Sequence, residues 1–139
     1  FCTTVPISQL HPAQSFLIEF MATSILIYAV CSIWDWRNEN WGDSTPIKFG
    51  LIVFLLTASV GPFTGASMNP ARTFGPALVT SCWDSHWLYW AAPLTSSLVT
   101  TLFYRFIYLS NIGVDEPRDF DFNVIASTKK ILVSRMSDV

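Results

Sequence analysis

A run of small residues that leads into Asn69 and Pro70 constrains the fold of this chain more than any other feature. Asn caps helices because its side-chain carbonyl satisfies a free backbone N–H, and Pro suits the first helical position, where its missing N–H is not needed. Strongly apolar segments bracket this signal, so we expect the helix to begin at membrane depth. Non-helical backbone at that depth is tolerated only where protein buries it or where it lines a water-filled cavity. The run therefore predicts a loop and a half-helix that face a pore.

The composition and the apolar runs predict an all-α membrane protein. Charged residues make up 13% of the 139 residues and apolar residues 51%, with a mean hydropathy of +0.41. Soluble domains carry about 25% charged residues. Apolar runs of about 20 residues are long enough to cross about 30 Å of hydrocarbon. We predict three spans, at about 15–34, 47–63 and 87–109, and a re-entrant loop with its half-helix at about 64–80.

The basic residues set the expected orientation. Lys and Arg are concentrated in the loop 35–48 and in the segment 111–139, whereas the opening loop has none. Because cytoplasmic loops carry the excess of basic residues, we expect 111–139 to be a cytoplasmic tail and 1–110 to be the membrane domain. The plasma membrane is the expected location. The chain begins at Phe1 rather than Met, which favours a piece of a longer protein.

Several function classes are disfavoured. A net charge of −2 without a basic run argues against nucleic-acid binding. Cys2, Cys31 and Cys82 have no metal-ligand spacing, and His11 and His86 are isolated and expected to be solvated in loops. We therefore expect no metal site, no cofactor and no enzymatic activity. Cys2 and Cys82 both fall on segments expected outside the cell, which leaves a disulfide between them open.

The string from Gly65 to Pro76, Gly-Ala-Ser-Met-Asn-Pro-Ala-Arg-Thr-Phe-Gly-Pro, resembles the second signature loop of the aquaporin (major intrinsic protein) family. This string is far more specific than Asn-Pro-Ala alone, and the flanking segments agree with it from about residue 1 to about residue 110. The resemblance implies the right half of an aquaporin-like bundle, with three transmembrane helices and one re-entrant half-helix. It also implies a missing N-terminal half with a second such loop, and assembly as a homotetramer.

Four consecutive residues of the string are expected to line the pore. Asn69 would present its side-chain NH2 to a neutral solute, and Pro70 and Ala71 begin the half-helix behind it. Arg72 is always charged and presents its donors in a rigid plane, so it would replace lost hydration and repel cations. An Arg within a membrane is otherwise very costly, which argues against a purely structural role. In the resemblance, Arg72 matches the arginine of the family's narrow outer filter.

Three further residues are expected at or beside this filter. Thr57 falls, counting back from Asn69, where water-selective aquaporins usually carry a histidine. Val53, one turn earlier, would line the same face, and Ala66 occupies another filter position. Thr is smaller than His, so the opening should be wider and should admit glycerol- or urea-sized solutes as well as water. Helix packing by the Thr57 hydroxyl is the alternative.

Glu19 is a carboxylate within a predicted span, and such a residue is a functional candidate by default. A proton relay would need a chain of titratable partners, and the predicted spans contain none. We expect Glu19 to accept hydrogen bonds from backbone N–H groups of the re-entrant loop. That role is similar to the one of the equivalent family residue, and it supports the pore rather than conducting.

The branch of the family can also be predicted by resemblance. A water-channel pattern without the filter histidine is similar to the insect branch known as entomoglyceroporins, and the strings 34–38 and 2–6 are similar to that branch as well. The water-channel pattern rests on positions at which the family separates water channels from glycerol facilitators, namely Thr73, Ala77, Tyr89 and Trp90.

The predicted function is a passive channel in the lipid bilayer for water and small uncharged solutes, with glycerol or urea among them. A strict water channel is one alternative. A structural or junctional membrane protein of the same fold that conducts little is another. Conduction of ions would need charged lumen residues beyond Arg72, and this half contains none.

Overall fold

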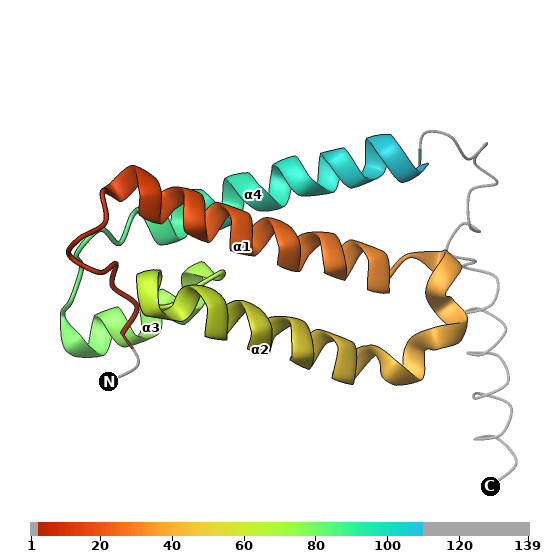
Figure 1. Ribbon diagram of the computed structural model, residues 1–139, viewed down its shortest axis with the longest axis horizontal. Coiled ribbons are helices and arrows are strands. Elements are labelled where there is room, and N and C mark those ends of the chain that lie inside the picture. The colour runs from red at the N-terminus through yellow and green to blue at the C-terminus, as the bar shows by residue number, and fades with distance from the viewer. Residues whose placement is uncertain (1–2, 110–139) are drawn as a thin grey trace, which may run out of the picture. The chain divides into compact units, whose positions relative to one another are not determined.

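The computed structural model describes residues 3–109, and the regular elements of this part are all helices (Figure 1). The fold class predicted from the sequence, an all-α bundle, is confirmed. Cys2 and the predicted tail 111–139 lie outside the described residues. The elements in chain order are α1 (Pro12–Ile33), a 3₁₀ helix η1 (Trp36–Ser44), α2 (Thr45–Thr64), α3 (Pro70–Thr80), α4 (Leu88–Tyr104) and a π-helical turn η2 (Arg105–Leu109).

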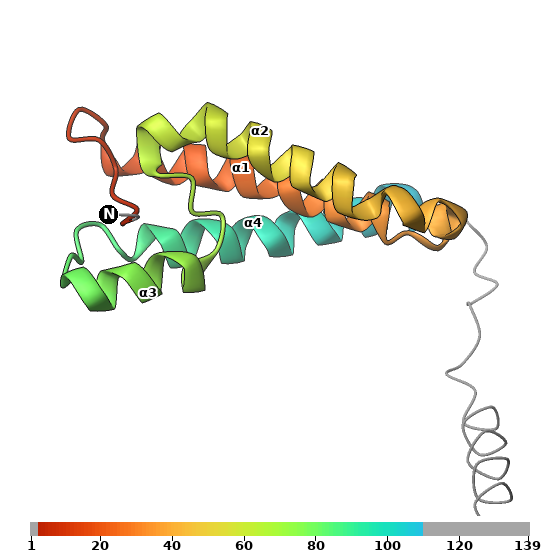
Figure 2. The same cartoon turned by 90° about the horizontal axis from the view of Figure 1, so that it is seen from below.

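Helix α1 is the centre of the bundle, because it packs against both α4 and α2 (Figure 1). The shorter α3 packs against α4, at the end of the bundle where the N-terminal segment also lies (Figure 2). The loop that leads from α2 into α3 therefore lies at this end, and η1 lies at the other. This arrangement brings residues near the start of the chain close to the loop and to α3.

Helix α1 begins at Pro12, three residues before the predicted start of the first span. His11 is its cap: the His11 Nδ1 atom accepts a hydrogen bond from the N–H of Ala13 at 3.3 Å. The Gln14 side chain accepts one from the N–H of His11 at 2.9 Å, which completes a capping box. His11 is exposed, as predicted, but it is not isolated, because its ring nitrogen caps the helix as a hydroxyl would.

Helix α2 runs through Pro62 and ends at Thr64. The predicted span ended at Phe63, one residue before the observed end of the helix. The helix ends where Gly65 adopts a left-handed backbone with φ of 83°. Such a conformation is the common C-terminal cap of a helix and favours glycine.

Small polar side chains join α1 to α4. The hydroxyls of Ser24 and Ser96 are 2.9 Å apart, and Ala92 and Thr100 are buried one turn on either side of Ser96. Small residues let two helices approach closely in lipid, where packing and short polar contacts drive association. This seam fixes α1 against α4 and so fixes the frame on which the loop is mounted.

Burial in the described part is the reverse of that in a soluble protein. The fully buried side chains are mostly polar, among them Glu19, Thr64 and Ser67, whereas Phe54 and Leu98 are more than 60% exposed. Apolar surface of this extent lies against lipid or against further protein. Two stretches, Pro12–Ile33 and Gly42–Thr64, are long and apolar enough to cross a membrane. Helix α4 has only 17 α-helical residues before its π-helical turn.

A charged cluster links Asp35, the cap residue of η1, to Tyr104 at the end of α4. The Asp35 carboxylate caps η1 by accepting from the N–H of Arg37 at 3.0 Å, and it also accepts from the Arg37 guanidinium, with Nε at 2.8 Å. The hydroxyl of Tyr104 donates to the same carboxylate at 2.7 Å. The hydrogen bonds from Arg37 hold the pKa of Asp35 well below its usual value. Asp35 is therefore charged at every physiological pH.

Candidate functional site

The loop of residues 65–69 joins α2 to α3 in an unusual backbone conformation. Gly65, Ala66 and Met68 all have positive φ, at 83°, 49° and 52°. Residues other than glycine adopt this region at a cost of about 1–3 kcal/mol each, and they persist only where the surroundings over-determine them. Contacts with the surrounding helices must therefore hold Ala66 and Met68 in this conformation.

The buried carboxylate of Glu19 supplies the largest part of that fixation. Its Oε1 atom accepts from the N–H of Ser67 at 2.9 Å and from the hydroxyl of Thr64 at 2.6 Å. Its Oε2 atom accepts from the N–H of Met68 at 2.8 Å. The side chain of Glu19 is completely buried. The hydrogen bonds predicted between Glu19 and the backbone of the loop are thus present, and they tie α1 to the loop by charge-assisted contacts.

Apolar packing and α4 hold the loop from the other sides. Ala66 and Met68 form a buried cluster with Ala22 of α1. The hydroxyl of Tyr89 on α4 donates to the carbonyl of Thr64 at 2.6 Å. The loop is therefore attached to α1, α2 and α4 at once, which explains how its positive φ angles are maintained.

Asn69 is the cap of α3, as its place before Pro70 predicts. Its Oδ1 atom accepts from the N–H of Ala71 at 2.9 Å. The hydrogen bond to Oδ1 fixes the plane of the Asn69 amide and therefore the direction of its NH2 group. This NH2 group forms no hydrogen bond within residues 3–109. The side chain is exposed. Asn69 thus offers two donor hydrogens at a fixed position, with Pro70 and Ala71 forming the first turn behind it.

Arg72 bends back across the loop from the first turn of α3. Its Nη1 atom donates to the carbonyl of Gly65 at 3.0 Å and also to the carbonyl of Ala66. The residue is exposed, and Nε and Nη2 form no hydrogen bond to the described residues. One nitrogen therefore anchors the guanidinium while its other donors stay available. The structure thus joins Arg72 to Ala66 in the loop that ends at Asn69, and the role of these residues in a pore stays a prediction.

Thr57 and Val53 lie on α2, away from the loop along the helix. Val53, Thr57, Val60 and Thr64 recur at spacings of four, three and four residues, so they share one face of α2. Val60 packs against the cluster of Ala66 and Met68, so this face is turned toward the loop. Both Thr57 and Val53 are half-buried. Thr57 and Val53 thus lie on the side of α2 that Val60 turns toward the loop, and no hydrogen bond joins Thr57 to Asn69 or Arg72 within residues 3–109; whether this side lines a pore stays a prediction.

His86 belongs to an aromatic cluster beside the start of α4. Its Nε2 atom accepts from the indole N–H of Trp90 at 3.1 Å, and its ring meets that of Trp83 edge-on at 4.9 Å. Phe74 of α3 packs against the same rings. The prediction of an isolated, solvated His86 is wrong, because the fold brings α3 and the loop after it against α4. The cluster braces α3 behind the loop.

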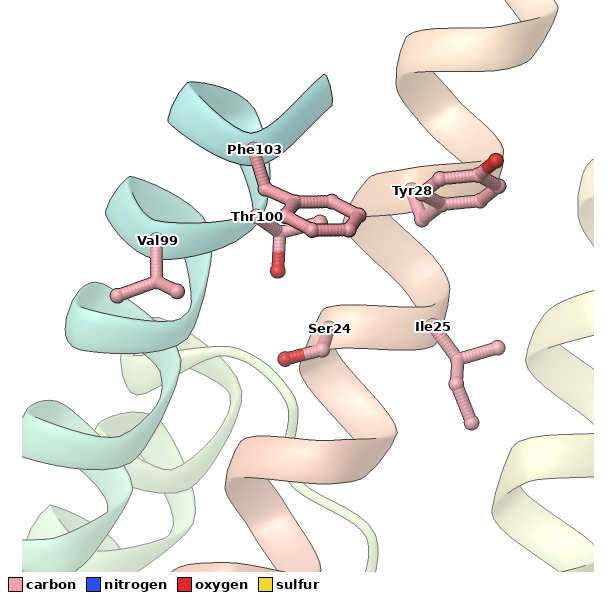
Figure 3. Close-up of a pocket in the computed structure, with 6 residues that line it drawn as sticks. All are labelled: Ser24, Ile25, Tyr28, Val99, Thr100 and Phe103. Carbon is pink, nitrogen blue, oxygen red and sulfur yellow. The ribbon is translucent and has the colours of Figure 1, made fainter. Parts of the chain in front are cut away.

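Two other kinds of site are relevant to residues 3–109, namely a metal site and a pocket that contains the predicted pore residues. Within residues 3–109, no group of three His, Cys, Asp or Glu side chains is arranged to hold a metal ion. A groove of about 290 Å³ opens between α1 and α4, away from the loop, and contains none of the predicted pore residues (Figure 3). Its lining is almost entirely apolar and consists of Ser24, Ile25, Tyr28, Val99, Thr100 and Phe103.

Two residues at the loop were not predicted from the sequence to act there. Thr4 and Ser67 are buried, and both form hydrogen bonds with the hydroxyl of Thr73. Thr73 itself was singled out only as a marker of the branch. A threonine in a polar opening segment carries no signal that it will be buried 69 positions away.

Fold and site together define the class of this protein. Long apolar helices surround a polar interior, and a short helix begins at a loop that a buried carboxylate holds; these features are those of a helical membrane protein. Residues 2–104 match the family model described as "Major intrinsic protein". The chain belongs to the major intrinsic protein family and is an integral membrane protein.

The similar proteins include aquaporins of plants. The chain is 40% identical over 108 residues to "Probable aquaporin TIP3-2" of Arabidopsis thaliana, covering 77% of this chain and 39% of the relative. It is 39% identical over 104 residues to "Aquaporin TIP4-4" of Zea mays, covering 74% and 41%. It is 39% identical over 98 residues to "Aquaporin TIP1-1" of Arabidopsis thaliana, covering 70% and 39%. The chain thus spans about two fifths of the length of these curated relatives.

Proposed function

We propose that this chain is the second half of a passive membrane channel for water and small uncharged solutes, with glycerol or urea among them. The observation that carries the proposal is the fixed pair of donor groups at the start of α3. The amide of Asn69 and the guanidinium of Arg72 are both exposed, and each is anchored through one atom while its other donors stay available. Glu19 supports the pore by holding the loop that ends at Asn69 and whose carbonyls anchor Arg72.

A neutral solute would pass by exchanging its water shell for hydrogen bonds from these donors. The N-terminus of α3 contributes a partial positive charge of about half an elementary charge, and Arg72 adds a full one. Cations, including hydronium, therefore meet an opposing field and lose hydration that the site does not replace. No covalent bond is made or broken, so the function needs no cofactor and no catalysis.

The choice among solutes is proposed from the residues at the constriction. Thr57 and Ala66 have small side chains, and Val53 continues the same face of α2 one turn away from the loop. A constriction of this composition is wider and less polar than one that contains a histidine. Passage of glycerol or urea with water follows, and it agrees with the entomoglyceroporin-like pattern of the sequence. A strict water channel follows instead if the first half narrows the opening.

The proposed channel contains a first half in addition to this chain. Residues 1–110 form the second half of the channel domain, with the spans and the re-entrant element as predicted, and 111–139 form a cytoplasmic tail. An N-terminal half supplies the second loop and closes the lumen. The complete subunits assemble as a homotetramer in the plasma membrane. Below, the full-length channel means this chain preceded by such a first half.

Osmotic swelling of oocytes that express the full-length channel tests the proposed function. Water, glycerol and urea permeabilities are measured for the parent, Thr57→His and Thr57→Val, each divided by the amount of channel at the cell surface. Thr57→His is expected to lower glycerol permeability more than water permeability, because the larger ring narrows the opening. Thr57→Val keeps the size of the side chain and removes only its hydroxyl, so it should leave the ratio of the two permeabilities nearly unchanged.

Each outcome of this experiment has one meaning. Glycerol flux well above background that Thr57→His suppresses supports the proposal. Water flux alone indicates a strict water channel. Flux of neither solute, with normal surface amounts, indicates a structural or junctional protein, and currents under voltage clamp indicate an ion channel. A glycerol-to-water ratio that Thr57→His leaves unchanged shows that Thr57 is not part of the filter.

A further inference from the structure

We propose that Thr4 is a positioning residue of this channel, which fixes Asn69 and Arg72 through a directed chain of buried hydroxyl groups. The inference rests on the proposed function, because Asn69 and Arg72 are the groups that contact the solute there. Thr4 lies in the segment before α1 and does not reach the pore itself. It acts through Thr73 and Ser67.

The chain of hydroxyls connects distant parts of the sequence. The Thr4 hydroxyl donates to Thr73 Oγ1 at 2.6 Å, and Thr73 Oγ1 lies 2.5 Å from Ser67 Oγ. The Ser67 hydroxyl donates to the carbonyl of Asn69 at 2.8 Å. Thr4 is 5% exposed, and Ser67 and Thr73 are each 1% exposed. Solvent therefore cannot replace any of these partners.

The direction of the chain follows from counting protons. A hydroxyl has a single hydrogen to donate. The hydrogen of Ser67 is used on the Asn69 carbonyl, so Thr73 must donate to Ser67, and Thr73 then has only acceptor capacity left for Thr4. Hydrogen bonds in such a directed chain polarise and strengthen one another. Thr4 is the donor that starts it, and the Asn69 carbonyl is where it ends.

Thr4 also touches the other end of the loop. A Cβ atom on Gly65 would lie 2.9 Å from Thr4 Cα and 3.0 Å from Thr4 Cγ2, so the two residues are in close contact. The carbonyl of Gly65 accepts from Arg72 Nη1. The segment that carries Thr4 is itself fixed, because the N–H of Ile7 donates to the carbonyl of Phe63 at 2.9 Å. Thr4 is thus connected to the carbonyl of Asn69 through the hydroxyl chain, and it packs against Gly65, whose carbonyl anchors Arg72.

The expected consequence is on selectivity. Without the Thr4 hydroxyl, Thr73 loses its donor, and the cap of α3 is held less firmly against a loop with positive φ at three residues. A solute with several hydroxyls needs several donors in register at once, whereas water needs fewer. Loss of part of one hydrogen bond corresponds to about a threefold effect on a rate. We expect the glycerol-to-water permeability ratio to fall by about that factor.

The test compares Thr4→Val with Thr3→Val and Thr4→Ser in the full-length channel. Thr4→Val keeps the shape and removes the hydroxyl, and Thr4→Ser keeps the hydroxyl and should restore the parent ratio. Thr3→Val is the matched control, because among residues 3–109 the Thr3 hydroxyl makes a single long, exposed hydrogen bond, to Thr80 at 3.4 Å. The readouts are the two permeabilities per channel at the surface and the amide hydrogen exchange of residues 65–73.

The proposal expects Thr4→Val, and not Thr3→Val, to lower the permeability ratio and to speed exchange in residues 65–73. A Thr4→Val channel that is only less abundant, with parent ratio and parent exchange, overturns it. A parent channel that passes neither solute refutes the proposed function instead. In that case the exchange measurement still decides whether Thr4 positions the loop, and unchanged exchange rejects it.

Discussion

The substitution Glu19→Gln tests the central contact of the site. The carboxylate accepts three hydrogen bonds, two at Oε1 from Ser67 and Thr64 and one at Oε2 from Met68. Glutamine has nearly the same shape, but only one of its two terminal atoms accepts. Its best orientation keeps the oxygen toward Ser67 and Thr64 and turns the NH2 toward the N–H of Met68, where a donor faces a donor.

The expected loss of stability follows from these contacts. A hydrogen bond to a charged group contributes about 1.5–3 kcal/mol and a neutral one about 1 kcal/mol. One bond is lost and two lose their charge assistance, which together amounts to about 3–4 kcal/mol. Relief from burying a charge offsets part of this loss, so a net decrease of about 2–3 kcal/mol in the free energy of unfolding is expected.

Chemical denaturation of the full-length channel in mixed detergent micelles measures this free energy. Asp43→Asn is the matched control, because it also removes one negative charge but at an exposed residue of η1. The control is expected to change stability by less than about 0.5 kcal/mol. A Glu19→Gln channel as stable as Asp43→Asn would refute the reasoning, since it would mean that the loop keeps its conformation without a charged acceptor.

Two further predictions concern backbone and charge. Gly65→Ala is expected to lower the free energy of unfolding by about 2 kcal/mol or more, because an L-residue at φ of 83° is strained and its Cβ would lie 2.9 Å from Thr4 Cα. The control is Gly50→Ala, where the Cβ would meet open space. This control should be neutral or stabilising in the same denaturation assay. Asp35→Asn is expected to lower the melting temperature at pH 7, because the hydrogen bonds from Arg37 hold the pKa of Asp35 well below its usual value. A depressed pKa stabilises the fold above the ordinary value of about 3.9 and loses that effect only as the pH falls further, so the difference between parent and Asp35→Asn should stay constant from pH 8 to 5. A difference that disappears between pH 8 and 5 would contradict this assignment, and Gly65→Ala with parent stability would contradict the other.

The features that the sequence alone determined are local ones. The cap formed by Asn69 and the place of Pro70 and Ala71 depend on contacts within three residues, so their order in the chain is enough to predict them. The helices follow from apolar runs in the same way, because a helix satisfies its own backbone groups within lipid. The contact between Glu19 and the loop spans 48 residues, and it was predicted from the cost of a charge in an apolar run together with the family resemblance rather than from local order.

The tertiary structure alone decided what depends on distant segments. Pro62 stays within α2, where the local sequence favoured an end to the helix. Thr4 is brought to Thr73 and Gly65 only when the segment before α1 folds over the loop, and nothing near Thr4 in the sequence indicates this. The hydrogen bonds from Arg72 to the carbonyls of Gly65 and Ala66 likewise depend on the positive φ angles of the loop, which the surrounding helices impose. Local capping rules act over a few residues, whereas the position of a donor in a pore is set by contacts that only the assembled bundle provides.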